Sequence, residues 1–131
     1  MKKSIMWKEI VVAAIFVGLV TFSLINIYYI KSTVSEILTH IDASITAAER
    51  GDWNIASRES ERACELWESC DDRTHIVLRH TAIENAEIAL NAHLGFMRAR
   101  NLYEGYGSAR TAQAMLDGIL ELERVRWGSV F

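Results

Sequence analysis

The feature that most constrains this chain is an uncharged apolar run near its N-terminus, from Ile10 to Ile30. A helix of about 21 residues rises about 31 Å, which matches the hydrocarbon core of a bilayer. Trp7 flanks one end of the run, and Tyr28 and Tyr29 flank the other, in the manner of an aromatic belt. The run therefore predicts a transmembrane helix over residues 10–30.

The charges on either side of this run predict its orientation. Three lysines lie within residues 1–9, whereas Lys31 stands alone at the other end. Positively charged flanks stay in the cytoplasm, so residues 1–9 are predicted to be cytoplasmic and residues 31–131 extracytoplasmic. A cleaved signal peptide is the main alternative. The run is longer than a usual signal core and no small-residue cleavage site follows it, so we expect a single-pass anchor in the cell membrane.

The charge balance beyond the run excludes one class of partner. From Lys31 to the end the chain has 11 basic and 16 acidic side chains, a net charge of −5. A nucleic-acid-binding domain needs a basic face for phosphates, so no nucleic-acid partner is expected. The 131 residues contain no proline, which favours long helices because proline breaks the helical hydrogen-bond pattern.

Apolar residues recur at steps of three and four after the run, which is typical of buried helical faces. The first stripe continues the anchor without a break as far as Gly51, which suits the left-handed turn after a helix: Val34, Ile37, Ile41, Ile45 and Ala48. Asp52 is a candidate cap for the next helix. That helix carries a seam of rings and small residues: Trp53, Ala56, Ser60, Ala63, Trp67 and Cys70.

Two further helices complete the prediction. The third has the inward stripe Ile76, His80, Ile83, Glu87, Leu90, Leu94 and Met97. The segment 103–108, YEGYGS, is predicted to be a turn, and Ser108 to cap a last helix with the stripe Ala109, Ala112, Leu116, Ile119 and Leu122. The fold class is therefore all-α: a transmembrane helix continuing into a small antiparallel bundle of about four helices. The expected helices cover about 31–50, 53–70, 73–101 and 108–126.

The C-terminal tail is too apolar for a solvated segment. Trp127, Val130 and Phe131 are expected to dock on the bundle or on a partner.

The polar residues of the third helix are the candidate chemistry. His80, Glu84 and Glu87 are spaced to share one helical face, and Asp72 with His75 could pair in the same way. A carboxylate-bridged metal bundle would need Glu-x-x-His on two helices, and the chain has none. We expect a histidine that is hydrogen-bonded inside the bundle. A metal site formed by these residues is a weak alternative. No catalytic residue and no cofactor are predicted.

The cysteines and tryptophans have structural interpretations. Cys64 and Cys70 lie six apart on one helix and point to different faces, so they cannot pair with each other. They are expected to be small buried hydrophobes. Trp53 and Trp67 fit a packed seam better than a ligand-stacking surface.

Together these residues resemble a known family. The basic start, the apolar anchor, Gly51-Asp52-Trp53, Trp67, His80 and the run from Ile83 to Leu90 are similar to short, N-terminally anchored bacterial proteins of spore-forming Gram-positive bacteria. That family is classed only as a domain of unknown function. The resemblance covers nearly the whole chain, and Trp53, Trp67, His80 and Glu87 match its recurrent positions. The chain departs from it at Gly105 and Gly107, where the family would have a helix.

The resemblance brings no activity and implies an accessory role beside other small membrane proteins. The expected function is a non-enzymatic, membrane-anchored helical interaction protein that docks on a membrane-protein partner or on itself. The alternative is an extracytoplasmic ligand- or metal-sensing bundle using His80, Glu84 and Glu87.

Overall fold

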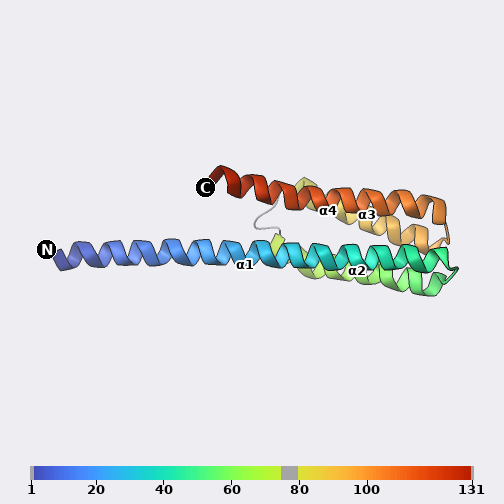
Figure 1. The fold of residues 1–131 in the computed structure, drawn as a ribbon, viewed down its shortest axis with the longest axis horizontal. Helices are drawn as coiled ribbons and strands as arrows, with labels where there is room; N and C mark the ends of the chain where they lie inside the picture. The colour runs from blue at the N-terminus through green and yellow to red at the C-terminus, as the bar shows by residue number, and fades with distance from the viewer. Residues whose placement is uncertain (1, 75–79, 131) are drawn as a thin grey trace.

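The computed structural model describes the backbone of residues 2–74 and 80–130, and the side chains of residues 6–70 and 82–121. The described residues form four α-helices and no strand: α1 (Lys2–Glu49), α2 (Trp53–Thr74), α3 (His80–Arg98) and α4 (Leu102–Val130). Successive helices run antiparallel, and α4 returns to lie beside α1 (Figure 1). The predicted all-α fold, a long apolar N-terminal helix followed by three more, is confirmed.

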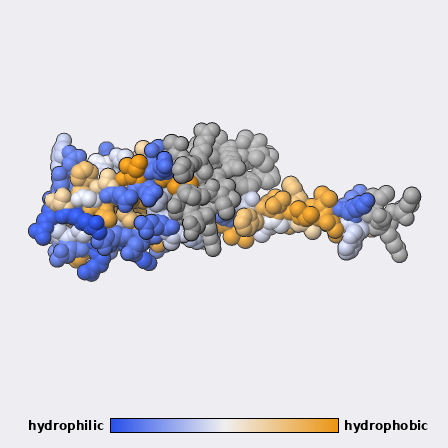
Figure 2. Space-filling model, turned by 180° about the vertical axis from the view of Figure 1, so that it is seen from behind, coloured by the Kyte–Doolittle hydropathy of each residue, from blue (hydrophilic) through white to orange (hydrophobic). Residues whose placement is uncertain are grey.

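α1 is one helix with two environments. Its 48 residues rise about 72 Å, and its N-terminal half projects alone beyond the bundle (Figure 1). Large apolar side chains of this half are exposed, and Figure 2 shows them as a bare hydrophobic stretch beside a mostly hydrophilic bundle. The helix is long and apolar enough to cross a membrane. From Ile30 onward one face is buried, at Val34, Ile37 and Ile41.

The bundle contains two apolar cores. The larger, which we name the proximal core, lies next to the projecting half of α1 and is formed by Ile30, Val34, Ile37, Ile41, Ala63, Trp67, Ile83, Ala86, Ala89, Leu90, Ala112, Leu116 and Ile119. The smaller, the tip core, lies at the far end and is formed by Ala47, Ala48, Ala56 and Met97. The predicted stripes of α1, α2 and α4 supply most of these residues.

Two turns close the far end of the bundle, and they share one hydrogen-bond pattern. After α1, the amide of Asp52 donates to the carbonyl of Ala47 across Gly51, whose φ is 81°. After α3, the amide of Asn101 donates to the carbonyl of Phe96 across Arg100, whose φ is 55°. Each is the pattern that ends a helix on a left-handed residue.

Several helix boundaries differ from the predicted ones, among them the end of α4, which lies at Val130 instead of about 126. α2 continues to Thr74 instead of ending at 70. α3 ends at Arg98 instead of 101, and α4 begins at Leu102, so the predicted turn over 103–108 is wrong. Residues 75–79 lie outside the described part of the chain.

Two contacts explain why the segment 103–108 is helical. The side-chain oxygen of Asn101 accepts a hydrogen bond from the amide of Glu104, which caps α4 seven residues before Ser108. Gly105 is buried, and a Cβ placed on it would overlap the methyl group of Met97. That glycine serves close packing between α3 and α4 and does not mark a turn.

Candidate functional site: a buried histidine layer

A layer of polar residues separates the two cores. Each helix contributes one buried member: Ser44 from α1, Ser60 from α2, His93 from α3 and Ser108 from α4. Ser44, Ser60 and His93 are at most 1% exposed. Buried polar groups need hydrogen-bond partners, so the contacts of this layer must be matched to the hydrogens that its side chains carry.

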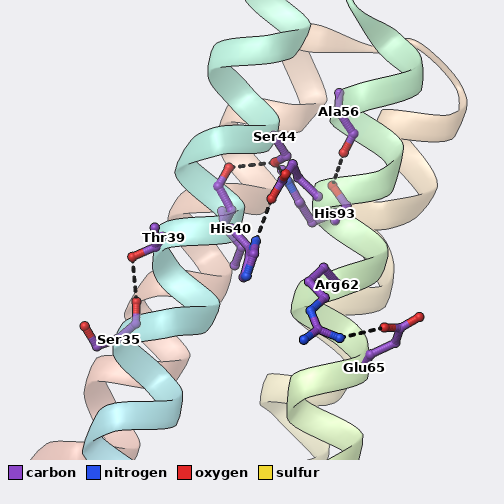
Figure 3. Close-up of polar contacts among 11 residues, drawn as sticks. Ser35, Thr39, His40, Ser44, Ala56, Arg62, Glu65 and His93 are labelled. Atoms are coloured by element: carbon purple, nitrogen blue, oxygen red, sulfur yellow. Dashed lines mark hydrogen bonds and ion pairs between the residues drawn. The ribbon is translucent and has the colours of Figure 1, made fainter.

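His93 joins α1 to α4 through its two ring nitrogens, and Figure 3 shows its contact with Ser44 of α1. Nε2 lies 2.7 Å from the hydroxyl of Ser44, and Nδ1 lies 2.9 Å from the hydroxyl of Ser108. Each serine also reaches back to its own helix. The Ser44 hydroxyl lies 2.6 Å from the carbonyl of Ile41, and the Ser108 hydroxyl lies 2.9 Å from the carbonyl of Gly105.

These four contacts need four hydrogens, and the neutral side chains supply three. Each hydroxyl carries one, and a neutral imidazole carries one. A neutral His93 therefore leaves one contact unfilled, while an imidazolium would donate from both nitrogens and let both serines donate to their carbonyls. The geometry can accept a second proton on His93 without moving a heavy atom.

Burial opposes that second proton. Removal from water lowers the pKa of His93 from 6.5 to about 4, and the backbone carbonyl of Gly105 offsets this only in part. No charged side chain contributes to the shift of the His93 pKa. At neutral pH the layer therefore holds a neutral imidazole and three hydrogens.

Two interhelical pairs flank the layer. His40 of α1 hydrogen-bonds through Nδ1 to the carboxylate of Glu59 on α2 (Figure 3). Arg98 of α3 donates to Glu61 of α2 at 2.7 Å. α2 is thereby tied to both of its neighbours near the level of the histidine.

The comparison with protein families identifies the chain. Residues 24–130 match the family described as "Domain of unknown function (DUF4363)". The chain belongs to this family. The match contains the whole bundle, both cores and the histidine layer, and it begins inside the apolar part of α1. Neither the curated proteins nor the solved structures gave a match to the chain.

Among the polar residues predicted as candidate chemistry, those that the structure describes do not share the buried position of His93. Glu87 is exposed, so its predicted position on the inward stripe is wrong, and Glu84 is exposed as well. The side chain of His80, like Asp72 and His75, lies outside the described part. Among the residues that the structure describes, no three histidines, cysteines or carboxylates gather as a metal site would require.

The buried stripe of α3 explains the error. It shares Ile83, Leu90 and Met97 with the predicted stripe, but it has Ala86 in place of Glu87 and His93 in place of Leu94. Both stripes keep steps of three and four, so spacing alone does not choose between them. A preference for the apolar Ala86 over Glu87 would have placed His93 on the buried face.

The tryptophans and cysteines of α2 lie as predicted. Trp67 is buried in the proximal core and Trp53 is half-buried beside the tip core. The indole Nε1 of Trp67 is buried without a hydrogen-bond partner in the described residues. Neither cysteine forms a disulfide bond among the residues that the structure describes. Burial, followed by the charge of Glu68, raises the pKa of Cys64 to about 11, so this thiol stays protonated.

Proposed function

We propose that this chain is a membrane-anchored, non-enzymatic interaction protein that holds a rigid helical bundle at a fixed height beside a bilayer. The observation that carries this proposal is the continuity of α1. The same helix provides a bare apolar segment and, from Ile30, one wall of the proximal core. A partner that met the bundle would therefore meet it at a defined distance from the membrane.

The charge asymmetry supports an orientation with the N-terminus in the cytoplasm and the bundle outside. The resemblance to anchored proteins of spore-forming Gram-positive bacteria supports the same arrangement. The partner is a membrane protein or a second copy of this chain, because a bundle fixed close to the bilayer reaches neighbours in the same membrane most readily.

Extraction and labelling test the anchor and its orientation. Alkaline carbonate should leave the protein in the membrane pellet, and release into the supernatant would overturn the anchor. An impermeant thiol reagent should label Asn54→Cys at the bundle tip in intact cells. It should label Ser4→Cys, the matched control, only after lysis, and the reverse pattern would overturn the orientation.

Crosslinking in native membranes tests the interaction. A short-range crosslinker followed by purification should give a discrete adduct, either a dimer of the chain or a complex with one membrane protein. A strictly monomeric protein without an adduct at any crosslinker concentration would refute the interaction role.

A further inference from the structure

An open groove of about 440 Å³ lies between α3 and α4 on the outside of the bundle. Most of its lining is small or apolar: Ala82, Asn85, Ala114, Met115, Gly118 and Ile119. Figure 1 shows α3 and α4 together on one side of the bundle and α1 with α2 on the other. A groove on the outer side of α3 and α4 therefore opens away from the helix that carries the apolar segment.

The groove is one end of a longer uncharged surface, which we name the α3–α4 stripe. Residues three, four or seven apart share one side of a helix. Exposed residues at these steps continue the groove towards the tip: Asn85 and Ala92 on α3, and Gly107, Thr111, Ala114 and Gly118 on α4. Charged side chains close the stripe at its two ends, Glu104 near the tip and Glu121 at the groove. Arg110 and Asp117 border it on the side of α4 that is turned away from α3.

The glycines of the stripe are not required by packing inside the chain. A Cβ placed on Gly107 or Gly118 would meet no atom within 4 Å. Gly105 on the same helix differs, because a Cβ there would overlap the methyl group of Met97. Beside Gly118, the apolar side chain of Met115 stays 38% exposed. The stripe thus leaves backbone and apolar surface open to a close neighbour from outside the bundle.

The contacts of His93 give the height of the groove above the apolar run. Ser44 and Ser108 both contact His93, so the three residues lie at one level of the bundle. α3 runs parallel to α1, and Ala82 precedes His93 by eleven residues, so Ala82 is level with about residue 33 of α1. That level is about 5 Å beyond Ile30, where the apolar run ends. A neighbour that fills the groove therefore stands close to the bilayer.

The charge pattern of the bundle favours a second copy of this chain as that neighbour. A copy anchored in the same bilayer stands parallel and at the same height, and a two-fold axis along the membrane normal relates the pair. Each level of one copy then faces the same level of the other, so like charges on the shared face would repel. The exposed side of α1 carries Glu36, Asp42 and Glu49 and fails this condition. The α3–α4 stripe is uncharged between its ends and meets it.

We propose that the α3–α4 stripe is the surface through which two copies of this chain associate, side by side in one membrane. This inference names the partner for the interaction role proposed above, and it rests on that role and on the anchoring of α1. α3 of each copy lies against α4 of the other, and the small side chains let the two backbones approach closely. The two α1 helices lie in the outer layers of the pair, so the anchors cross the membrane without touching.

Cysteine crosslinking in native membranes tests this surface with the full-length chain. Ala114→Cys places a thiol in the stripe, and Thr39→Cys, the matched control, places one at nearly the same level on the exposed side of α1. A short bismaleimide should convert Ala114→Cys into a species of twice the chain mass and leave Thr39→Cys and the parent protein as monomers. The parent is a suitable background at neutral pH, because Cys70 is buried and burial raises the pKa of Cys64 to about 11.

The contrary outcomes separate this surface from the interaction role itself. Equal dimer formation by Ala114→Cys and Thr39→Cys would indicate random encounters and overturn the proposed surface. An adduct of Ala114→Cys with a different membrane protein, without a dimer, would overturn the second copy as the partner and leave the interaction role standing. A disulfide dimer of Gly18→Cys, without a dimer of Ala114→Cys, would place the contact between the anchors and overturn the surface. No adduct from any variant would overturn both proposals.

A charged substitution provides a second measurement that does not depend on thiol chemistry. Ala114→Arg puts like charges at the same level of both copies, so it should raise the dissociation constant of the dimer in detergent micelles at least about tenfold. Thr39→Arg is the matched control and should leave the constant unchanged. Sedimentation equilibrium measures both, and circular dichroism checks that each variant keeps its helices, as expected for exposed positions. Equal dissociation constants for the two variants would overturn the proposed surface.

Discussion

The two cores of the bundle differ in what stabilises them. In the described residues the proximal core buries thirteen side chains, among them Trp67 and Leu116, whereas the tip core buries three alanines and Met97. The tip instead has the histidine layer, two turns and an interhelical ion pair. Apolar burial is thus concentrated beside the apolar segment of α1, and hydrogen bonds and backbone geometry carry more of the stability at the far end.

The largest expected effect is a cavity in the proximal core. Leu116 is completely buried, and truncation in Leu116→Ala should cost about 4 kcal/mol of unfolding free energy. Ile88→Ala is the matched control on a side chain that is 67% exposed, and it should change stability by less than about 0.5 kcal/mol. Chemical denaturation followed by circular dichroism measures both. Equal costs would show that the proximal core does not dominate stability.

Acid should weaken the bundle through the histidine layer. The pKa of His93 is lowered on folding, so the folded state binds this proton less readily than the unfolded state. The contribution of the neutral His93 to the unfolding free energy is fully present above pH 6.5, and it is lost as the pH falls from 6.5 to about 4. Each pKa unit corresponds to about 1.4 kcal/mol, so the loss amounts to about 3 kcal/mol.

The variant His93→Gln isolates this contribution from other titrating groups. The unfolding free energy is measured as a function of pH for both proteins, and their difference is plotted. That difference should shift by about 3 kcal/mol between pH 6.5 and 4. A flat difference would mean that the layer already accepts the second proton, as its four contacts permit, and that burial does not exclude it.

The fold could be predicted from the sequence because its signals are local and strong. The apolar run, the absence of proline and the 3-4 stripes of α1, α2 and α4 each follow from residues close in the chain. The start of α4 could not be found in this way, because glycines in YEGYGS suggest a turn. The close approach that Gly105 allows, to Met97, depends on the packing of a different helix.

The candidate site was harder to predict. His93 is one of four histidines, and its partners lie 49 and 15 residues away on other helices. Ser44 and Ser108 have no distinctive spacing in the sequence, and the sequence around Ser108 suggests a helix cap. Only the complete bundle shows that every helix places one polar residue at the same level.

Substitutions in the two turns at the tip should change the unfolding free energy by smaller amounts, and in opposite directions. Gly51 and Arg100 hold the same left-handed position, where a side chain costs about 1 kcal/mol relative to glycine. Gly51→Ala should therefore lower the unfolding free energy by about 1 kcal/mol, and Arg100→Gly should raise it by somewhat less, because glycine also gains entropy when unfolded. Thermal melts of both variants measure the pair. A loss of stability in Arg100→Gly would show that the guanidinium group stabilises the tip.

The smallest expected effect concerns the ion pair between α2 and α3. Arg98 and Glu61 lie 2.7 Å apart with side chains that are 59% and 46% exposed, so solvent screens their attraction. Glu61→Gln should cost less than about 1 kcal/mol at low salt and almost nothing at high salt. Glu65→Gln is the control, since its 3.4 Å pair with Arg62 lies within α2 and joins no helices. A loss of unfolding free energy in Glu61→Gln that persisted at high salt would contradict the screening. It would mean that this pair stabilises the tip more than the small apolar core of the tip does.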